Sequence, residues 1–187
     1  MVQAIPEPRP PLRLRFWPTE RPIALSLGDG TLVLSTGWLA RGTQEDFAAS
    51  LAHEAAHELL GHGPRFAATT VGGGLLMAGT LALAPLAAPP LLAAGVPLLG
   101  AYARGQEYEA DALGLWLYER AGYPRAAYLA HLRHLATFPR PDLWLSLHPD
   151  LQARLRRLEA GPVRVPVISG VRDRGEERQA LIRPGVR

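Results

Sequence analysis

The sequence of 187 residues contains no cysteine, no lysine and no asparagine. Without cysteine the chain has no disulfide bond, no thiolate metal site and no cysteine nucleophile. All 20 basic residues are arginine, so chemistry that needs a lysine is excluded as well, namely Schiff-base formation and phosphate binding by the lysine of a P-loop. These absences remove several classes of enzyme and of metal site.

Clustered positive charge is also missing. The formal net charge is only +3, and the arginines are spread along the chain. A nucleic-acid surface is typically a basic patch with interleaved aromatic residues, and because the sequence has none we expect no nucleic-acid partner. Residues 1–11 contain prolines and scattered charges but no apolar core of a secretion signal, so we expect the chain to start in the cytoplasm.

The length is typical of a single domain with a substantial core. We expect residues 1–11 to be an extended, proline-rich lead-in and residues 12–161 to form the folded domain. Residues 162–187 are rich in arginine, proline and glycine, and we expect an extended or disordered tail there.

Short strands are predicted near the N-terminus. In residues 12–16 apolar side chains alternate with arginine, a period-2 pattern that predicts a half-buried strand. Two apolar runs, 23–27 and 31–35, are separated by Gly-Asp-Gly at 28–30, which predicts a β-hairpin.

The first long helix has a clear start. Thr43 and Asp46 are spaced as a capping pair, which predicts a helix running to about residue 60. Apolar residues at every fourth position from 47 to 59 predict its buried face. His53 and His57 lie well away from that face, a placement that suits a cleft better than a packed interior.

Residues 53–57 read His-Glu-Ala-Ala-His, the pattern H-E-x-x-H. Positions i and i+4 lie about 40° apart around a helix, so both imidazoles can contact one metal ion. Glu54 is then placed to take a proton from zinc-bound water. The alternative is a histidine pair that binds no metal.

A catalytic zinc site needs a third protein ligand. The predicted helix 104–121 offers Glu107, Glu109 and Asp111. Glu107 and Asp111 share a face, whereas Glu109 points about 200° away from Glu107. We predict Glu107 as the ligand, with Asp111 accepting the N–H of a ligating imidazole and fixing its tautomer. The alternative is a solvated acidic face.

Between these helices, residues 66–103 carry no charge and are flanked by Arg65 and Arg104. A bilayer span needs about 20 apolar residues, so 66–84 and 86–103 can form a membrane hairpin with both arginines on the cytoplasmic side. Proline and glycine interrupt the second leg. The alternative is a pair of buried helices that cover the active site of a soluble protein.

Taken in order, the motifs resemble the gluzincin metallopeptidases of family M48. The similar segments are the hairpin 22–39, the zinc helix 53–62, the ligand helix with Gln-Glu-Tyr-Glu-Ala-Asp at 106–111, and Ser-Leu-His-Pro at 146–149 followed by an arginine. The resemblance implies an α+β, mainly α-helical, gluzincin-like catalytic domain. This expected domain has a small N-terminal β-hairpin or sheet, and the apolar helical hairpin is inserted between the zinc helix and the third-ligand helix.

The resemblance implies that His53, His57 and Glu107 bind Zn²⁺, that Glu54 is the general base, and that Asp111 supports a ligand. It further implies a catalytic site completed by two residues from the C-terminal element.

Those two residues are His148 and Arg154. His148 would lie near the metal, where it stabilises the oxyanion or regulates access, and Arg154 would brace the region. Leu147 replaces the threonine usual in the family. The alternatives are a helix start after His148 and a surface charge at Arg154. His131 and His134 are expected to be exposed or to line a cleft.

The predicted function is that of a zinc metalloendopeptidase acting on unfolded or membrane-associated proteins, with a protein or peptide substrate pairing along residues 31–35 as an edge strand. We expect membrane association through lipid contacts of residues 66–103, with the catalytic side cytoplasmic; the alternative is a soluble cytoplasmic protein. The competing functions are a non-catalytic membrane or interaction module with a structural zinc site, and a peptidase kept latent by its own apolar segment or tail.

Overall fold

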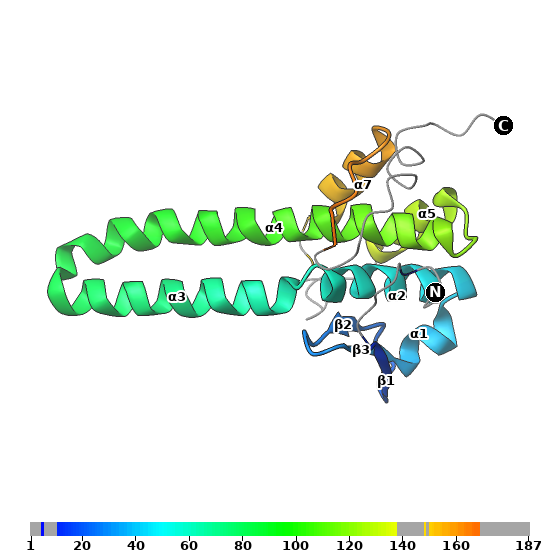
Figure 1. The fold of residues 1–187 in the computed structure, drawn as a ribbon, viewed down its shortest axis with the longest axis horizontal. Coiled ribbons are helices and arrows are strands. Elements are labelled where there is room, and N and C mark those ends of the chain that lie inside the picture. The colour runs from blue at the N-terminus through cyan, green and yellow to red at the C-terminus, as the bar shows by residue number, and fades with distance from the viewer. Residues whose placement is uncertain (1–4, 6–10, 138–147, 149, 169–187) are drawn as a thin grey trace.

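A computed structural model describes residue 5 and residues 11–137, 148 and 150–168 (Figure 1). The strands are β1 (Arg13–Trp17), β2 (Ala24–Ser26) and β3 (Thr31–Ser35), and the helices are α1 (Thr36–Arg41), α2 (Gln44–Leu59), α3 (His62–Leu83), α4 (Ala88–Arg120), α5 (Arg125–Leu135) and α7 (Leu151–Glu159). A short 3₁₀ turn, η2 (Pro85–Ala87), joins α3 to α4. The chain is mainly helical with a small N-terminal sheet, as the sequence predicts for an α+β fold.

The sheet has the order β1-β3-β2, with β1 parallel and β2 antiparallel to β3. The predicted hairpin is confirmed, and Gly28 and Gly30 take the positive φ values that its turn requires. The prediction that Thr31–Ser35 is an edge strand is wrong, because β3 is hydrogen-bonded on both sides. β2 is one of the two outer strands.

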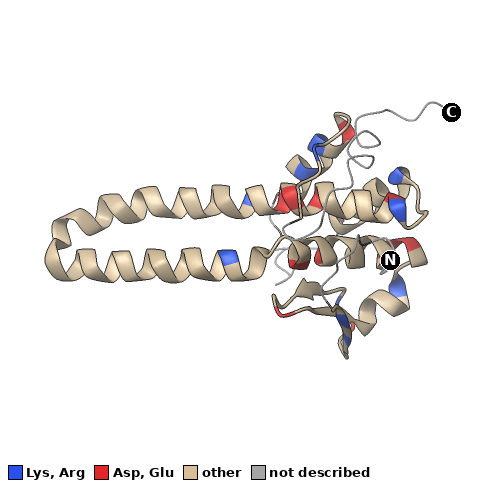
Figure 2. Cartoon of the chain, in the orientation of Figure 1, with Lys and Arg blue, Asp and Glu red and all other residues tan. Residues whose placement is uncertain are grey.

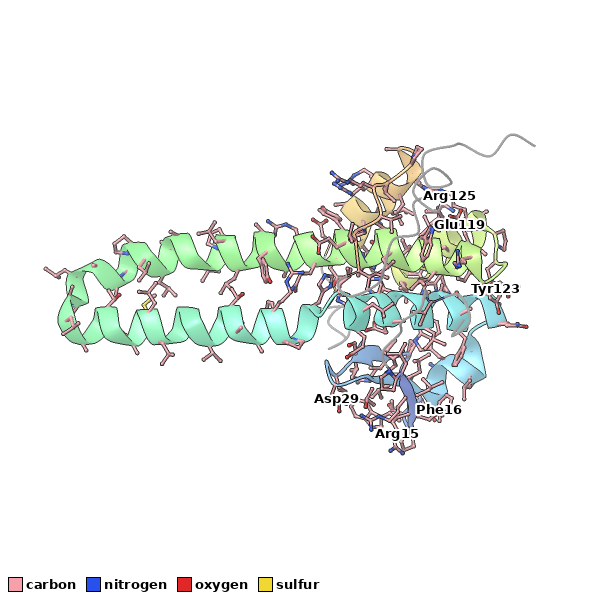
Figure 3. All side chains as sticks on the ribbon, viewed as in Figure 1. Arg15, Phe16, Asp29, Glu119, Tyr123 and Arg125 are labelled. Atoms are coloured by element: carbon pink, nitrogen blue, oxygen red, sulfur yellow. The ribbon has the colours of Figure 1, made fainter. Side chains whose placement is uncertain are left out.

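The prediction of a half-buried first strand is also wrong, because all five residues of β1 are exposed. The exposed fractions of Leu14 and Phe16 are 40% and 50%. Helix α2 packs mainly on β2 and β3, and it meets β1 through the stacked rings of Phe47 and Phe16. Figure 3 shows Arg15 and Phe16 at this outer margin of the sheet.

Helix α2 is the centre of the fold. The predicted capping pair is confirmed: the Thr43 hydroxyl accepts from the Asp46 amide, and the Asp46 carboxylate accepts from the Thr43 amide, both at 3.1 Å. Figure 1 shows α2 lying between the sheet and α4. Because neighbours cover several sides of α2, the prediction of a single buried face is wrong. His53 is 5% exposed and therefore buried as well.

The contact between α2 and α4 depends on a glycine. A Cβ atom added at Gly114 would lie 2.9 Å from the Tyr128 hydroxyl and 3.1 Å from Cα of His53. Only glycine allows α4 to approach the helix of the H-E-x-x-H motif this closely. The approach brings the carboxylates of α4 next to the histidines of α2.

Helix α3 and the first half of α4 extend together away from the rest of the molecule (Figure 1). Figure 2 shows this hairpin free of charge except at its base, where Arg65 and Arg104 lie. Both helices are long and apolar enough to cross a membrane, and the windows that qualify are 0% and 6% buried. The predicted interruption of the second leg is wrong, since α4 runs unbroken through Pro97.

The two C-terminal helices pack together on the body. The predicted helix after Pro124 is confirmed as α5, and the last helix, α7, is described from Leu151 onward; Pro149 lies outside the described residues. Arg125 donates to the carbonyl oxygens of Leu158 and Gly161, which ties the start of α5 to the end of α7. Figure 3 shows Arg125 and Glu119 at the end of the body opposite the hairpin. Most of the predicted lead-in, and residues 169–187 of the predicted tail, also lie outside the described residues.

Candidate metal centre

Seven predicted site residues come together beside α2. They are His53, Glu54, His57, Glu107, Asp111, His148 and Arg154. Four of them, His53, His57, Glu107 and His148, each offer one donor atom within 4.8 Å of the others. The side chains of these four are only 4–11% exposed. The cluster joins α2, α4 and His148, which lies three residues before α7, across long stretches of sequence.

The spacing of the three predicted ligands suits a tetrahedral ion. The Nε2 atoms of His53 and His57 are 3.1 Å apart, and the carboxylate oxygens of Glu107 lie 3.5 Å and 3.2 Å from them. Zinc ligands at about 2.0–2.1 Å in tetrahedral geometry are separated by about 3.3 Å. The observed separations lie on either side of that value.

The outer ring nitrogens of the two histidines indicate where their protons lie. Nδ1 of His53 is 3.2 Å from the Asp111 carboxylate, and Nδ1 of His57 is 2.9 Å from Nδ1 of His62. A neutral imidazole carries one proton, so an Nδ1 that donates leaves a lone pair on Nε2. When both Nδ1 atoms donate, two lone pairs face each other at 3.1 Å beside a carboxylate, and this arrangement is unstable unless a proton or a metal ion lies between them. The residues present therefore fit a zinc ion.

Charges around the cluster hold its carboxylates ionised. Burial acts to raise the pKa of Glu107, but the charges of His148 and Arg154 outweigh it and keep that pKa well below its usual range. Burial also acts to raise the pKa of Asp111, but the charge of Arg154 outweighs it and lowers this pKa to about 2. For His53, burial and Arg154 lower the pKa, yet Asp111 and Glu107 raise it overall to about 9. A metal ion binding to His53 must therefore displace a proton.

Arg154 is the most constrained charge in the site. Its exposed fraction is 1%, so the reading of this residue as a surface charge is wrong. Its Nε and Nη2 atoms each donate to the Asp111 carboxylate at 2.7 Å, and Nη1 lies 2.7 Å from Glu107 Oε2. One side chain of α7 thereby holds two carboxylates of α4 in fixed positions.

His148 lies where a fourth donor would bind. Its Nδ1 is 3.3 Å from Nε2 of His53 and 3.1 Å from each Glu107 oxygen. Its Nε2 is 3.5 Å from Oε1 of Glu54, a buried atom without a hydrogen-bond partner among the described residues. Ser146 and Leu147 lie outside the described residues.

Three other residues were not assigned roles by the sequence. His62 and Glu109 form a contact at 3.1 Å behind His57, and their helical positions alone gave no signal that they would meet. His131, expected to be exposed or to line a cleft, is instead buried, with its Nδ1 2.9 Å from the Asp46 carboxylate. The capping carboxylate of α2 draws this ring inward; His134 is partly exposed, as expected.

A cavity of about 330 Å³ opens beside the cluster. Its lining residues include Glu54, His57, Glu107 and His148 from the cluster, Leu25 and Ser26 from β2, and Phe66 and Ala103 from the base of the hairpin. The cavity therefore connects the candidate metal centre with an outer strand and with the start of the apolar helices.

Comparison with known protein families gives one match. The sequence model of peptidase family M48 matches residues 23–161, a range that includes every predicted site residue. No curated protein matches the chain.

Proposed function

The chain belongs to peptidase family M48, a family of zinc metallopeptidases, and from this premise we propose that it is a zinc-dependent metalloendopeptidase. One observation carries the proposal. Two imidazole nitrogens and an ionised carboxylate converge next to a cavity of about 330 Å³. Glu54 lines the same cavity with a buried carboxylate oxygen.

In the proposed mechanism His53, His57 and Glu107 hold zinc. Zinc held there would supply Lewis-acid chemistry, which lowers the pKa of a water molecule and polarises a carbonyl group. Glu54 accepts the proton of the attacking water at its carboxylate and then delivers it to the leaving amine. Its burial excludes bulk water from that proton.

Asp111 and Arg154 position these groups. Asp111 accepts the Nδ1 proton of His53, which keeps the inner nitrogen free to bind metal. Arg154 fixes Asp111 and Glu107 together through contacts of 2.7 Å. We propose that this buried arginine sets the geometry of the site without touching the substrate.

His148 favours a latent form of the enzyme. Its Nδ1 stands among the predicted ligands, and its Nε2 faces Glu54, so the ring covers the space between metal and base. We propose that the ring withdraws during turnover and then offers a donor to the oxyanion. The same position also suits the competing function, a non-catalytic module with a closed structural zinc site. In such a closed site the buried carboxylate of Glu54, which faces the cavity, would have no role, and this favours the enzyme.

We propose that substrate pairs with β2 rather than with β3. β2 is an outer strand of the sheet, and Leu25 and Ser26 line the cavity next to the candidate metal centre. An extended peptide added along this edge forms main-chain hydrogen bonds that are largely independent of sequence. Such binding suits unfolded protein substrates.

We further propose that residues 66–103 enter a membrane. The hairpin is apolar and exposed, and the arginines at its base suit the cytoplasmic interface. The unit 12–161 is then a catalytic domain at the membrane surface, flanked by the lead-in 1–11 and the tail 162–187. Alkaline extraction of membranes from cells producing the full chain tests this, and release of the protein into the soluble fraction would contradict it.

The decisive test of catalysis is Glu54→Gln. This variant should lose cleavage of a labelled unfolded protein while retaining one zinc per chain, because the amide cannot take the proton. Glu45→Gln, an exposed position in the first turn of α2, is the matched control and should cleave normally. Normal cleavage by Glu54→Gln would exclude the proposed mechanism.

A further inference from the structure

A second line of hydrogen bonds leads away from the candidate metal centre. Nδ1 of His57 is 2.9 Å from Nδ1 of His62, and Nε2 of His62 is 3.1 Å from Oε2 of Glu109. His62 is only 2% exposed, while the Glu109 side chain is 45% exposed and lies 3.7 Å from Arg65. A predicted ligand is thus connected through one buried imidazole to a carboxylate at the surface.

Metal binding by His57 would fix the direction of each hydrogen bond in this line. If Nε2 of His57 is to bind a metal, its proton must be on Nδ1, which then donates to Nδ1 of His62. His62 must in turn carry its own proton on Nε2, and this nitrogen donates to Glu109. Because the Glu109 carboxylate can only accept, the proton of His62 lies on Nε2 and that of His57 on Nδ1, as metal binding requires.

The two histidines of the H-E-x-x-H motif therefore have different support. The Nδ1 atom of His53 faces the Asp111 carboxylate directly. The Nδ1 atom of His57 is instead linked to the Glu109 carboxylate through His62. Without His62, the outer nitrogen of His57 would lose the acceptor that fixes its tautomer and its ring orientation.

The line also crosses the base of the apolar hairpin. His62 is the first residue of α3, and Glu109 belongs to α4. The Gln106 amide of α4 donates to the backbone carbonyl of His62 at 3.3 Å, so both the main chain and the side chain of His62 are attached to α4. The orientation of His57 is in this way coupled to how α3 and α4 meet.

We propose that His62 and Glu109 are positioning residues for zinc, holding the His57 imidazole in the metal-binding tautomer and fastening it to the base of the α3–α4 hairpin. The inference rests on the proposed zinc site. It assigns roles to two residues outside the ligand set and explains why Glu109, on a different face of α4 from Glu107, still serves the same centre.

The test compares two substitutions of similar size at one position. In His62→Gln the amide can still accept from His57 and donate to Glu109, whereas His62→Leu can do neither. Zinc affinity of the full chain is measured by competition with a chromophoric chelator, and ligand geometry by the visible spectrum of the cobalt-substituted protein. His62→Leu should bind zinc about 10- to 100-fold more weakly with an altered cobalt spectrum, and His62→Gln should stay close to the wild type.

Glu109→Gln provides a second variant that leaves the buried ring in place, so it decides the question if His62→Leu does not fold. It should also weaken zinc binding, while Glu119→Gln, a carboxylate at the far end of α4 (Figure 3), should not. Equal losses of zinc affinity in His62→Leu and His62→Gln, or no loss in any variant, would overturn the proposed role of this line of hydrogen bonds. If the wild-type chain itself binds no zinc, the proposed function fails, a result distinct from tight zinc binding by wild type and variants alike.

Discussion

Replacing Arg154 with leucine removes the charge that joins α7 to the carboxylates of α4. The guanidinium is buried, and it makes three contacts of 2.7 Å with Asp111 and Glu107. Leucine fills a similar space without a charge. Both carboxylates then remain in the interior with their principal cation gone.

The expected loss of stability follows from these contacts. Removing one partner of a buried ion pair costs about 3–5 kcal/mol, because the remaining charge is left uncompensated. In a chain of this length a change of 1 kcal/mol shifts Tm by about 2–4 °C, so Arg154→Leu should lower Tm by about 6–20 °C in the metal-free protein. Saturating zinc should recover part of the loss, since the cation compensates Glu107.

Thermal unfolding followed by circular dichroism, with chelator and with zinc, measures both effects. Arg156→Leu is the matched control, an exposed arginine of α7 whose replacement should change the free energy of unfolding by no more than about 0.5 kcal/mol. If Arg154→Leu and Arg156→Leu have the same Tm in the presence of chelator, the buried arginine does not stabilise the carboxylates, and the reasoning is refuted.

Two further predictions concern His148 and Asp111. His148 is proposed both to cover the space between metal and base at rest and to donate to the oxyanion during turnover. His148→Ala should therefore lower kcat for an unfolded substrate by about 10²- to 10³-fold through the lost donor, and should also lower KM through the lost cover; an unchanged or raised KM would exclude the latent form. Arg154 lowers the pKa of Asp111 in the folded state to about 2, against 3.8 for an unperturbed aspartate, so the contribution of about 2 kcal/mol is complete above pH 4 and disappears as pH falls through 2. Asp111→Asn should flatten this part of the acid unfolding curve, and an unchanged curve would contradict the assignment.

The parts of the fold that the sequence predicted depend on neighbours in the chain. The capping pair Thr43 and Asp46, the turn 28–30 and the adjacency of His53 and His57 each involve residues no more than four positions apart. Backbone geometry determines such relations once the type of element is known. The predicted faces of α2 and β1 are wrong because burial depends on which elements pack against them.

The sequence by itself determined the family, the chemistry of the donor set and the apolar character of residues 66–103, because residue types in a local pattern carry that information. Only the tertiary structure decided that Arg154 is buried, that His148 stands among the ligands, and that Glu109 reaches His57 through His62. Each of these contacts joins different elements, and Arg154 meets Asp111 across 43 positions of sequence. Their geometry depends on the register and close packing of helices, here on the approach of α4 to α2 at Gly114, and no local pattern specifies that approach.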